Sequence, residues 1–98
     1  MSSNENVQVA FCWYEPDEWE MLKRTAVDAE KLDDTYAEWK SNANNTIGEI
    51  RSQGVEVKKV SLKMHELESW CRNKAYVNNA EARSEYAAYK LQNRARKT

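Results

Sequence analysis

The side chains that could do chemistry are few and stand apart along this chain. His65 is the only histidine, and it lies six residues before Cys71 in a segment with helical spacing. Six residues turn a helix by about 240°, so the two side chains face different ways and do not form a nucleophile–base pair. We expect His65 to be an exposed residue of a first helical turn. We expect Cys71 and the other cysteine, Cys12, to be packing groups that could approach each other in the core.

Metal and phosphate sites are not indicated. An acidic run lacks the bend glycine and the distal glutamate of a calcium loop, and a solvated helix start explains it better; the run consists of Glu15, Asp17, Glu18 and Glu20. Asp33 and Asp34 are typical of a turn and cap. The only glycines, Gly48 and Gly54, form no phosphate loop, and no nucleophile elbow, zinc motif or kinase signature is present. We expect no catalysis, no metal and no cofactor.

Aromatic side chains and one arginine are the candidates for a binding site. The four tryptophans all fall on predicted inward faces, and they exceed what so small a core usually needs. Arg83 and Tyr86 lie three residues apart on one predicted helix, with Arg83 at the border of the apolar stripe. A structural salt bridge with Glu38 or a helix end is the better explanation of Arg83, and an acidic group on a partner is the alternative. The candidate binding residues are Trp13, Trp39, Arg83 and Tyr86.

The C-terminal segment carries a basic patch of Lys90, Arg94, Arg96 and Lys97. Such patches attract phosphate backbones without sequence choice. A solvated helix end, where basic residues favour the dipole, is the other explanation. Because the net charge is −1 and the sequence pI is about 5.9, the chain lacks the strong positive charge of a typical nucleic-acid binder. Nucleic acid is therefore an alternative partner that we do not favour.

Composition predicts one folded domain over residues 1–98. The chain has 98 residues, of which 41% are hydrophobic and 32% charged. No apolar run approaches the roughly 20 residues that span a bilayer, and no basic start followed by an apolar stretch suggests a secretory signal. We therefore expect no membrane association and a cytoplasmic location, with two reduced thiols. Residues 1–49 carry a net charge of −7 and residues 50–98 a net charge of +6, which we attribute to acidic and basic helices packed together.

The apolar spacing predicts two strands and four helices. Residues 7–14 are a strand that is apolar on both sides in its second half. Residues 55–62 are a second strand in which the alternation slips, either because the strand carries a bulge or because Val55 still belongs to the turn. The helices are expected near 16–30, 35–53, 64–73 and 79–92. Thr35 is expected to begin the second helix as a cap, Asn78 and Asn79 are the candidate caps of the fourth, and Gly54 is expected to end the second in a left-handed conformation. Residues 1–6 are expected to be loose and the basic tail 93–98 to fray.

This order defines a helix-rich α+β domain of the β-α-α-β-α-α type. Two intervening helices bring the chain back, so the strands most simply run antiparallel. A sheet of two strands is marginal by itself. We therefore hypothesise a homodimer that completes a shared sheet by pairing edge to edge.

Four segments resemble a family of small uncharacterised bacterial proteins. They are TYAEW (35–39), GVEVKKVSL (54–62), ELESWC (66–71) and EARSEYAA (81–88), and the match covers most of residues 11–88. The shared positions are cores and caps, so the resemblance implies a fold and no activity. Lys63 departs from the pattern, because an acidic helix cap is expected there.

The leading hypothesis for function is a non-enzymatic cytoplasmic interaction or regulatory module that self-associates. It depends on the surplus of aromatic residues, the missing catalytic sets and the incomplete sheet. The alternatives are a nucleic-acid-associated accessory protein that uses the basic final helix, and a small-ligand binder at a groove of tryptophans and Arg83.

Overall fold

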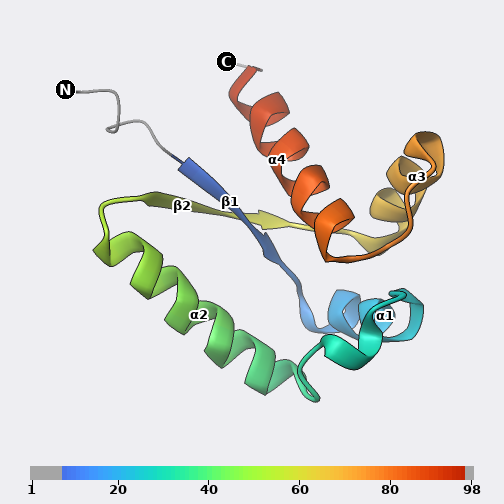
Figure 1. The fold of residues 1–98 in the computed structure, drawn as a ribbon, viewed down its shortest axis with the longest axis horizontal. Coiled ribbons are helices and arrows are strands. Elements are labelled where there is room, and N and C mark those ends of the chain that lie inside the picture. Colours follow the sequence, from blue (N-terminus) through green and yellow to red (C-terminus); the bar gives the residue numbers. More distant parts are fainter. Residues whose placement is uncertain (1–7, 97–98) are drawn as a thin grey trace.

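The computed structural model describes the backbone of residues 8–96 and the side chains of residues 8–94. Two strands and four α-helices follow one another along the chain (Figure 1): β1 (Gln8–Trp13), α1 (Pro16–Thr25), the short 3-10 helix η2 (Ala29–Lys31), α2 (Tyr36–Ser52), β2 (Glu56–Ser61), α3 (Met64–Lys74) and α4 (Ala80–Arg96). The predicted helix-rich α+β class and element order are confirmed.

The two strands run parallel, so the antiparallel prediction was wrong. Gln8 lies opposite Glu56 at one end of the sheet, and Trp13 lies opposite Ser61 at the other. The physical reason is that only α2 runs back along the sheet, whereas α1 lies beyond its end (Figure 1). A single helix returning along the strands is the usual crossover between parallel neighbours.

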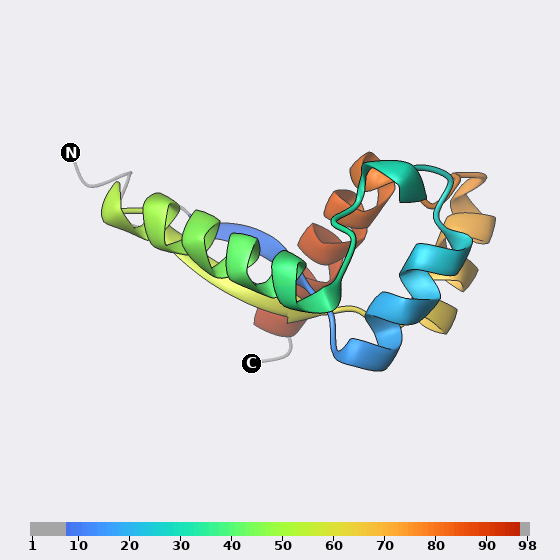
Figure 2. The ribbon, with the colours of Figure 1, turned by 90° about the horizontal axis from the view of Figure 1, so that it is seen from below.

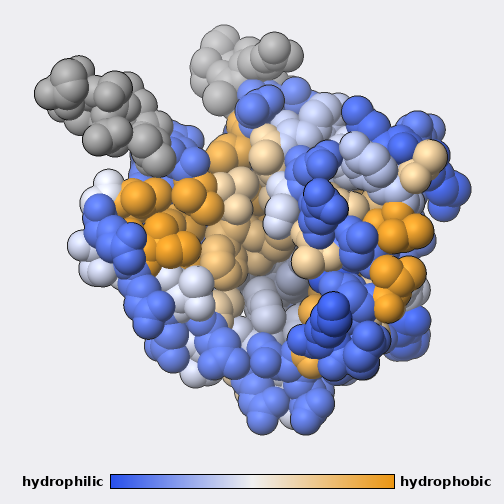
Figure 3. All heavy atoms as spheres, viewed as in Figure 1, coloured by the Kyte–Doolittle hydropathy of each residue, from blue (hydrophilic) through white to orange (hydrophobic). Residues whose placement is uncertain are grey.

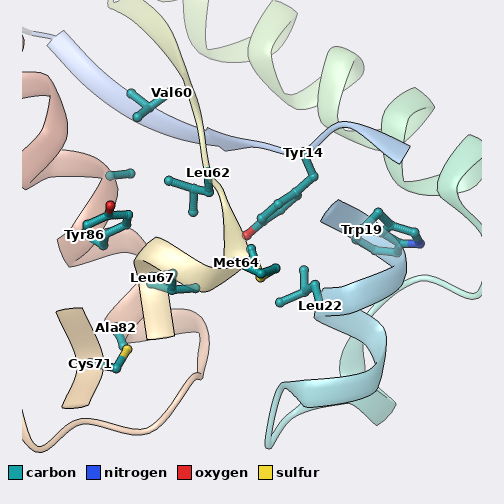
Figure 4. Close-up of a cluster of buried hydrophobic side chains, with 11 residues drawn as sticks. Tyr14, Trp19, Leu22, Val60, Leu62, Met64, Leu67, Cys71, Ala82 and Tyr86 are labelled. Carbon is teal, nitrogen blue, oxygen red and sulfur yellow. The ribbon is translucent and has the colours of Figure 1, made fainter. Parts of the chain in front are cut away.

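Helices cover both faces of the sheet. Figure 2 shows α2 running along one face, with α4 on the far side. On the α2 face, Trp13 and Val57 pack against Ala43 and Ile47. On the α4 face, Val60 packs in the main core (Figure 4). The sheet is thus the middle layer of three.

Two covered faces explain the slipped alternation of β2. Val57 faces α2 and Val60 faces α4, and both are buried. The register is continuous from Glu56 to Ser61, so no bulge is present in the strand. Val55 precedes the strand, as one of the two sequence-based explanations held.

The main core lies where α1, α3 and α4 meet the end of the sheet (Figure 4). Leu22, Leu62, Leu67 and Val60 are its largest fully buried side chains. Burial of such a side chain contributes about 1.5 to 3 kcal/mol, so this cluster accounts for much of the driving force for folding.

The first helix ends at Thr25, five residues earlier than predicted. The chain leaves the helix because its next residues have partners elsewhere. The amide of Val27 donates to the carbonyl of Asn78 at 3.0 Å, and the carboxylate of Asp28 accepts from Arg83 at 2.9 Å. These contacts bind the α1–α2 connection to the start of α4.

Three of the four predicted helix caps are confirmed. Thr35 Oγ1 accepts from the amide of Glu38 at 3.1 Å, and Gly54 has the left-handed φ of 88°. At the start of α4, Asn79 accepts from the amide of Ala82 at 2.9 Å. Asn78, the other predicted cap of this helix, is buried and accepts from Arg83 instead.

The helix cap that Lys63 cannot provide comes from another helix. Glu18 of α1 accepts a hydrogen bond from the amide of Met64 at 2.7 Å, at the first residue of α3. A carboxylate at a helix N-terminus is favoured by the helix dipole. Glu18, which the sequence placed in a solvated acidic run, therefore links α1 to α3.

The final helix continues to Arg96, beyond the predicted end at residue 92. Leu91 still packs against the main core, and the residues that follow have good helix propensity. Residues 93–96 are thus helical, which corrects the frayed tail over that range. Residues 97–98, like the loose segment 1–6, lie outside the described residues.

Ala75 ends α3 in the left-handed conformation, with φ of 61°. This conformation costs an L-residue about 1 to 2 kcal/mol, and glycine avoids the cost. We expect Ala75→Gly to raise the free energy of unfolding by about 1 kcal/mol, measured by urea titration. Ala88→Gly, at an exposed position within α4, is the matched control and should lower it by about 1 kcal/mol. A loss of stability in both variants would contradict this assignment.

Candidate functional site

The outer edge of β1 has backbone groups without a strand partner. The amide of Leu62 donates to the carbonyl of Trp13 at 3.0 Å, and Trp13 lies opposite Ser61. In a parallel pair, alternate residues direct both backbone groups to the partner strand. The amides and carbonyls of Val9 and Phe11 therefore point to β2, as those of Trp13 do. The amides and carbonyls of Ala10 and Cys12 point outward. Within residues 8–96, no hydrogen bond to those outward groups is found.

The outer edge of β2 is protected by basic side chains. There the outward carbonyls belong to the alternate residues Val57, Lys59 and Ser61. Arg51 Nη2 donates to the carbonyl of Val57 at 3.1 Å, and Lys90 Nζ donates to that of Ser61 at 3.1 Å. Basic side chains along an edge strand oppose pairing with another chain.

The two strands also differ in charge and burial. The β1 sequence, QVAFCW, has no charged residue, whereas the β2 sequence, EVKKVS, has one acid and two lysines. The valines of β2 are buried, while residues 9–12 of β1 are only half-buried. The open edge is thus the neutral and apolar one.

A groove of about 280 Å³ follows the β1 edge; we call it the β1-edge groove. Its strand residues all come from β1, and the helices α1, α2 and α4 contribute the rest of the lining together with Tyr14 and Leu32. Figure 3, which views the molecule from the side of β1, shows apolar atoms across the middle of this surface between hydrophilic borders. The lining residues are Ala10, Phe11, Cys12, Tyr14, Trp19, Leu32, Trp39, Ala80, Arg83 and Ser84.

Aromatic rings form one end of this groove. The Trp39 ring centroid lies 4.9 Å from that of Trp13 and 5.4 Å from that of Trp19. Tyr36 Oη donates to the carbonyl of Tyr14 at 2.9 Å, so this side chain occupies a carbonyl just after the end of β1. The open stretch of edge is therefore bounded at its C-terminal end. Of the predicted binding residues, Trp39 and Arg83 line the groove, and the Trp13 ring packs against the ring of Trp39.

Arg83 forms an internal ion pair, as the sequence favoured, but its partner is not Glu38. Its guanidinium donates to both carboxylate oxygens of Asp28, at 3.1 and 2.9 Å, and to Asn78 Oδ1 at 3.0 Å. Arg83 is only 5% exposed. Since most of its donors are occupied, Arg83 holds the wall of the groove and is poorly placed to bind an anionic ligand.

The acid–base properties of the groove agree with a packing role. The hydrogen bonds from Arg83, together with its charge, hold the pKa of Asp28 below the usual range. Burial raises the pKa of the Cys12 thiol, and burial also raises the pKa of Tyr14. Both groups are therefore uncharged near neutral pH, and Cys12 lacks the thiolate needed for nucleophilic chemistry. Cys12 Sγ donates to the carbonyl of Arg83 at 3.4 Å, which joins β1 to α4.

Tyr86, the fourth predicted binding residue, belongs to a different site. Its ring lies 5.2 Å from Trp70 and 6.2 Å from Tyr89, measured between centroids. With Lys90, Arg94 and Asn93, the two tyrosines line a second groove of about 390 Å³ on α4. Lys90 is engaged there, since it also lies 3.9 Å from Glu66. Of the rest of the basic patch, the Arg96 side chain and Lys97 lie outside the described part of the chain.

The remaining chemical candidates are not brought together. His65 is exposed and Cys71 is buried on α3, as their spacing predicted. Burial, followed by the nearby charge of Glu68, raises the pKa of the Cys71 thiol. Among the described residues, no three His, Cys, Asp or Glu side chains gather in a group that could hold a metal ion. None of the helices in the same range is long and apolar enough to cross a membrane.

Comparison with known proteins adds nothing to this geometry. No protein-family model, no curated protein and no solved structure matches the chain. The resemblance to small bacterial proteins stays a prediction.

The sequence prediction of edge-to-edge pairing did not say which edge is open, and it missed Asp28. The edge had a signal, because a neutral strand and a lysine-bearing strand in one small sheet indicate which edge is protected. Asp28 had none, since it was placed inside a helix that in fact ends before it.

The Arg83–Asp28 pair should be visible in the pH dependence of stability. Asp28→Asn leaves a buried guanidinium uncompensated, and we expect a loss of about 3 kcal/mol at pH 7. Because the folded-state pKa of Asp28 is lowered, the stabilisation is complete above about pH 4 and is lost as the pH falls through the lower, folded value. The difference between the two proteins, measured by urea unfolding, should therefore shrink in acid. Asp34→Asn, at an exposed position in the same connection, should have little effect. A difference independent of pH would contradict the assignment.

Proposed function

We propose that this protein is a non-enzymatic interaction module that binds an extended polypeptide segment along the outer edge of β1. The observation that carries the proposal is the contrast between the two edges of the sheet. One edge is charged and its carbonyls at Val57 and Ser61 are occupied, while the other is neutral and directs the groups of Ala10 and Cys12 outward. Addition of a strand to an open sheet edge is a common way of binding a peptide backbone.

The β1-edge groove supports this mode of binding. A strand laid beside β1 would pair with its backbone and place alternate side chains toward the two flanking helices. Trp39 on the α2 side and Ala80 and Ser84 on the α4 side lie where such side chains would pack. The lining offers little charge, because Arg83 is neutralised by Asp28. The segment should accordingly be neutral and rich in apolar residues.

The location that we propose is cytoplasmic. Cys12 and Cys71 are both free thiols, which suits a reducing compartment.

A nucleic-acid partner is the second candidate, and the groove on α4 favours it. Tyr89 is 48% exposed beside Tyr86, and Arg94 lines the same hollow. Aromatic rings with nearby cations can stack bases and contact phosphates. Against it, Lys90 is already bound to Ser61 and Glu66.

The nucleic-acid candidate makes its own prediction. If it is right, a labelled single-stranded oligonucleotide should bind with an affinity that falls steeply with salt. Tyr89→Ala should then weaken binding by about 1 to 3 kcal/mol, measured by fluorescence anisotropy. Absence of binding at low salt, or binding that Tyr89→Ala leaves unchanged, would remove this candidate.

The strand-addition proposal is tested with proline at each edge of the sheet. Ala10→Pro removes an outward amide from the open edge, and Lys59→Pro removes one from the protected edge. Both positions tolerate proline because the lost amide bonds no other strand. A displayed library of random peptides, selected on the wild-type protein, is the probe. We expect the selected peptides to bind Lys59→Pro like the wild type and Ala10→Pro at least about tenfold more weakly.

Circular dichroism and urea unfolding establish that both proline variants remain folded. Selected peptides that bind Ala10→Pro as tightly as the wild type would contradict strand addition at β1. A selection that yields no binder at a dilution where light scattering shows a single-chain mass would contradict it as well.

A further inference from the structure

We infer that the segment docked on β1 is the β1 strand of a second copy of this chain, running antiparallel across a two-fold axis at Ala10. The inference rests on the proposed function, since it names the partner of the same edge. It would turn two sheets of two strands into one sheet with the order β2-β1-β1-β2.

The position of the axis follows from the length of the open edge. The outward residues of β1 are Gln8, Ala10 and Cys12, and beyond them the carbonyl of Tyr14 is bonded to Tyr36. Ala10 is the midpoint of this open stretch. An axis there places Ala10 opposite itself and Gln8 opposite Cys12 of the other copy. These are pairs in which the two residues exchange both backbone hydrogen bonds.

The side chains of the strand are suited to this pairing. The same register places Val9 opposite Phe11 of the other copy on the α2 face, and such pairs of β-branched and aromatic residues stabilise antiparallel strands. Val9 and Phe11 are both half-buried in the single chain, so each has surface left to cover. β1 has no charged residue, and a two-fold axis would therefore bring no like charges together along it.

The layers on both sides also agree with a two-fold axis through the sheet. A rotation about an axis perpendicular to the sheet keeps each face on its own side. The α2 helices of the two copies would lie on one face and the α4 helices on the other, as in a single chain (Figure 2). Most small soluble oligomers have this symmetry, in which one surface is complementary to itself. The protected edges of β2 would become the outer edges of the joined sheet.

The experiment measures mass and the contact at the axis on the full chain. Light scattering after size exclusion gives the mass over a range of concentrations. We expect the wild type and Lys59→Pro to reach twice the mass of the chain, and Ala10→Pro to dissociate at about 10- to 100-fold higher concentration. Single cysteines introduced into β1 then report the register by forming disulfides between the two copies. They are introduced into a Cys12→Ala, Cys71→Ala background whose mass is checked first.

In that background we expect Ala10→Cys to form a disulfide between the two copies under oxidised glutathione. Its Cα atoms would lie about 5.5 Å apart, within the range of a disulfide. The control is Phe11→Cys, whose Cα atoms would lie about 8 Å apart in the proposed register, too far to be bridged. Preferential cross-linking of Phe11→Cys would overturn the register, and a dimer that Ala10→Pro leaves intact would overturn the site.

A single-chain mass at every concentration would overturn the choice of partner. Strand addition itself would then be decided by the peptide selection, in which Ala10→Pro still distinguishes binding at this edge.

Discussion

The constraint on which this structure depends is that every strand has hydrogen-bonding groups on two sides. A sheet of two strands satisfies only the inner side, and helices packed on its faces leave the backbone groups at its edges unpaired unless a side chain reaches them. The two outer edges of this sheet differ in whether side chains occupy their outward backbone groups. Arg51 and Lys90 occupy outward carbonyls of β2, whereas the groups of Ala10 and Cys12 on β1 face an apolar groove. The account of function follows from that asymmetry, because a neutral edge beside apolar side chains is where another strand binds most easily.

The groove is held open by contacts between distant parts of the chain. Arg83 of α4 binds Asp28 in the α1–α2 connection, which fixes the side of the groove that faces α4. Tyr36 of α2 bonds to the end of β1, which fixes the aromatic side. Glu18 joins α1 to α3 in the same way. Charged and polar side chains therefore act here as connections between distant elements of the fold.

Local patterns predicted most of the elements, while long-range contacts decided the rest. Thr35 and Gly54 bound α2 where cap chemistry places them. The parallel strand direction was missed because it depends on α1 lying beyond the sheet, which apolar spacing does not show. Of the two candidate caps of α4, Asn79 is the cap, whereas Asn78 pairs with Arg83, a tertiary contact that cap chemistry does not show. Of the predicted binding residues, Trp39 and Arg83 line the β1-edge groove, whereas Tyr86 lines the other groove with Tyr89 and Lys90 further along α4.

The most direct test of the central claim is amide hydrogen exchange along β1, measured residue by residue by NMR at low and high protein concentration. The account predicts slow exchange at Val9 and Phe11 at both concentrations, because their amides bond to β2. Ala10 and Cys12 should exchange fast when dilute and slowly when concentrated. Fast exchange at Ala10 and Cys12 at both concentrations would contradict pairing with a second copy. Equal protection of all four amides in dilute solution would contradict the open edge itself.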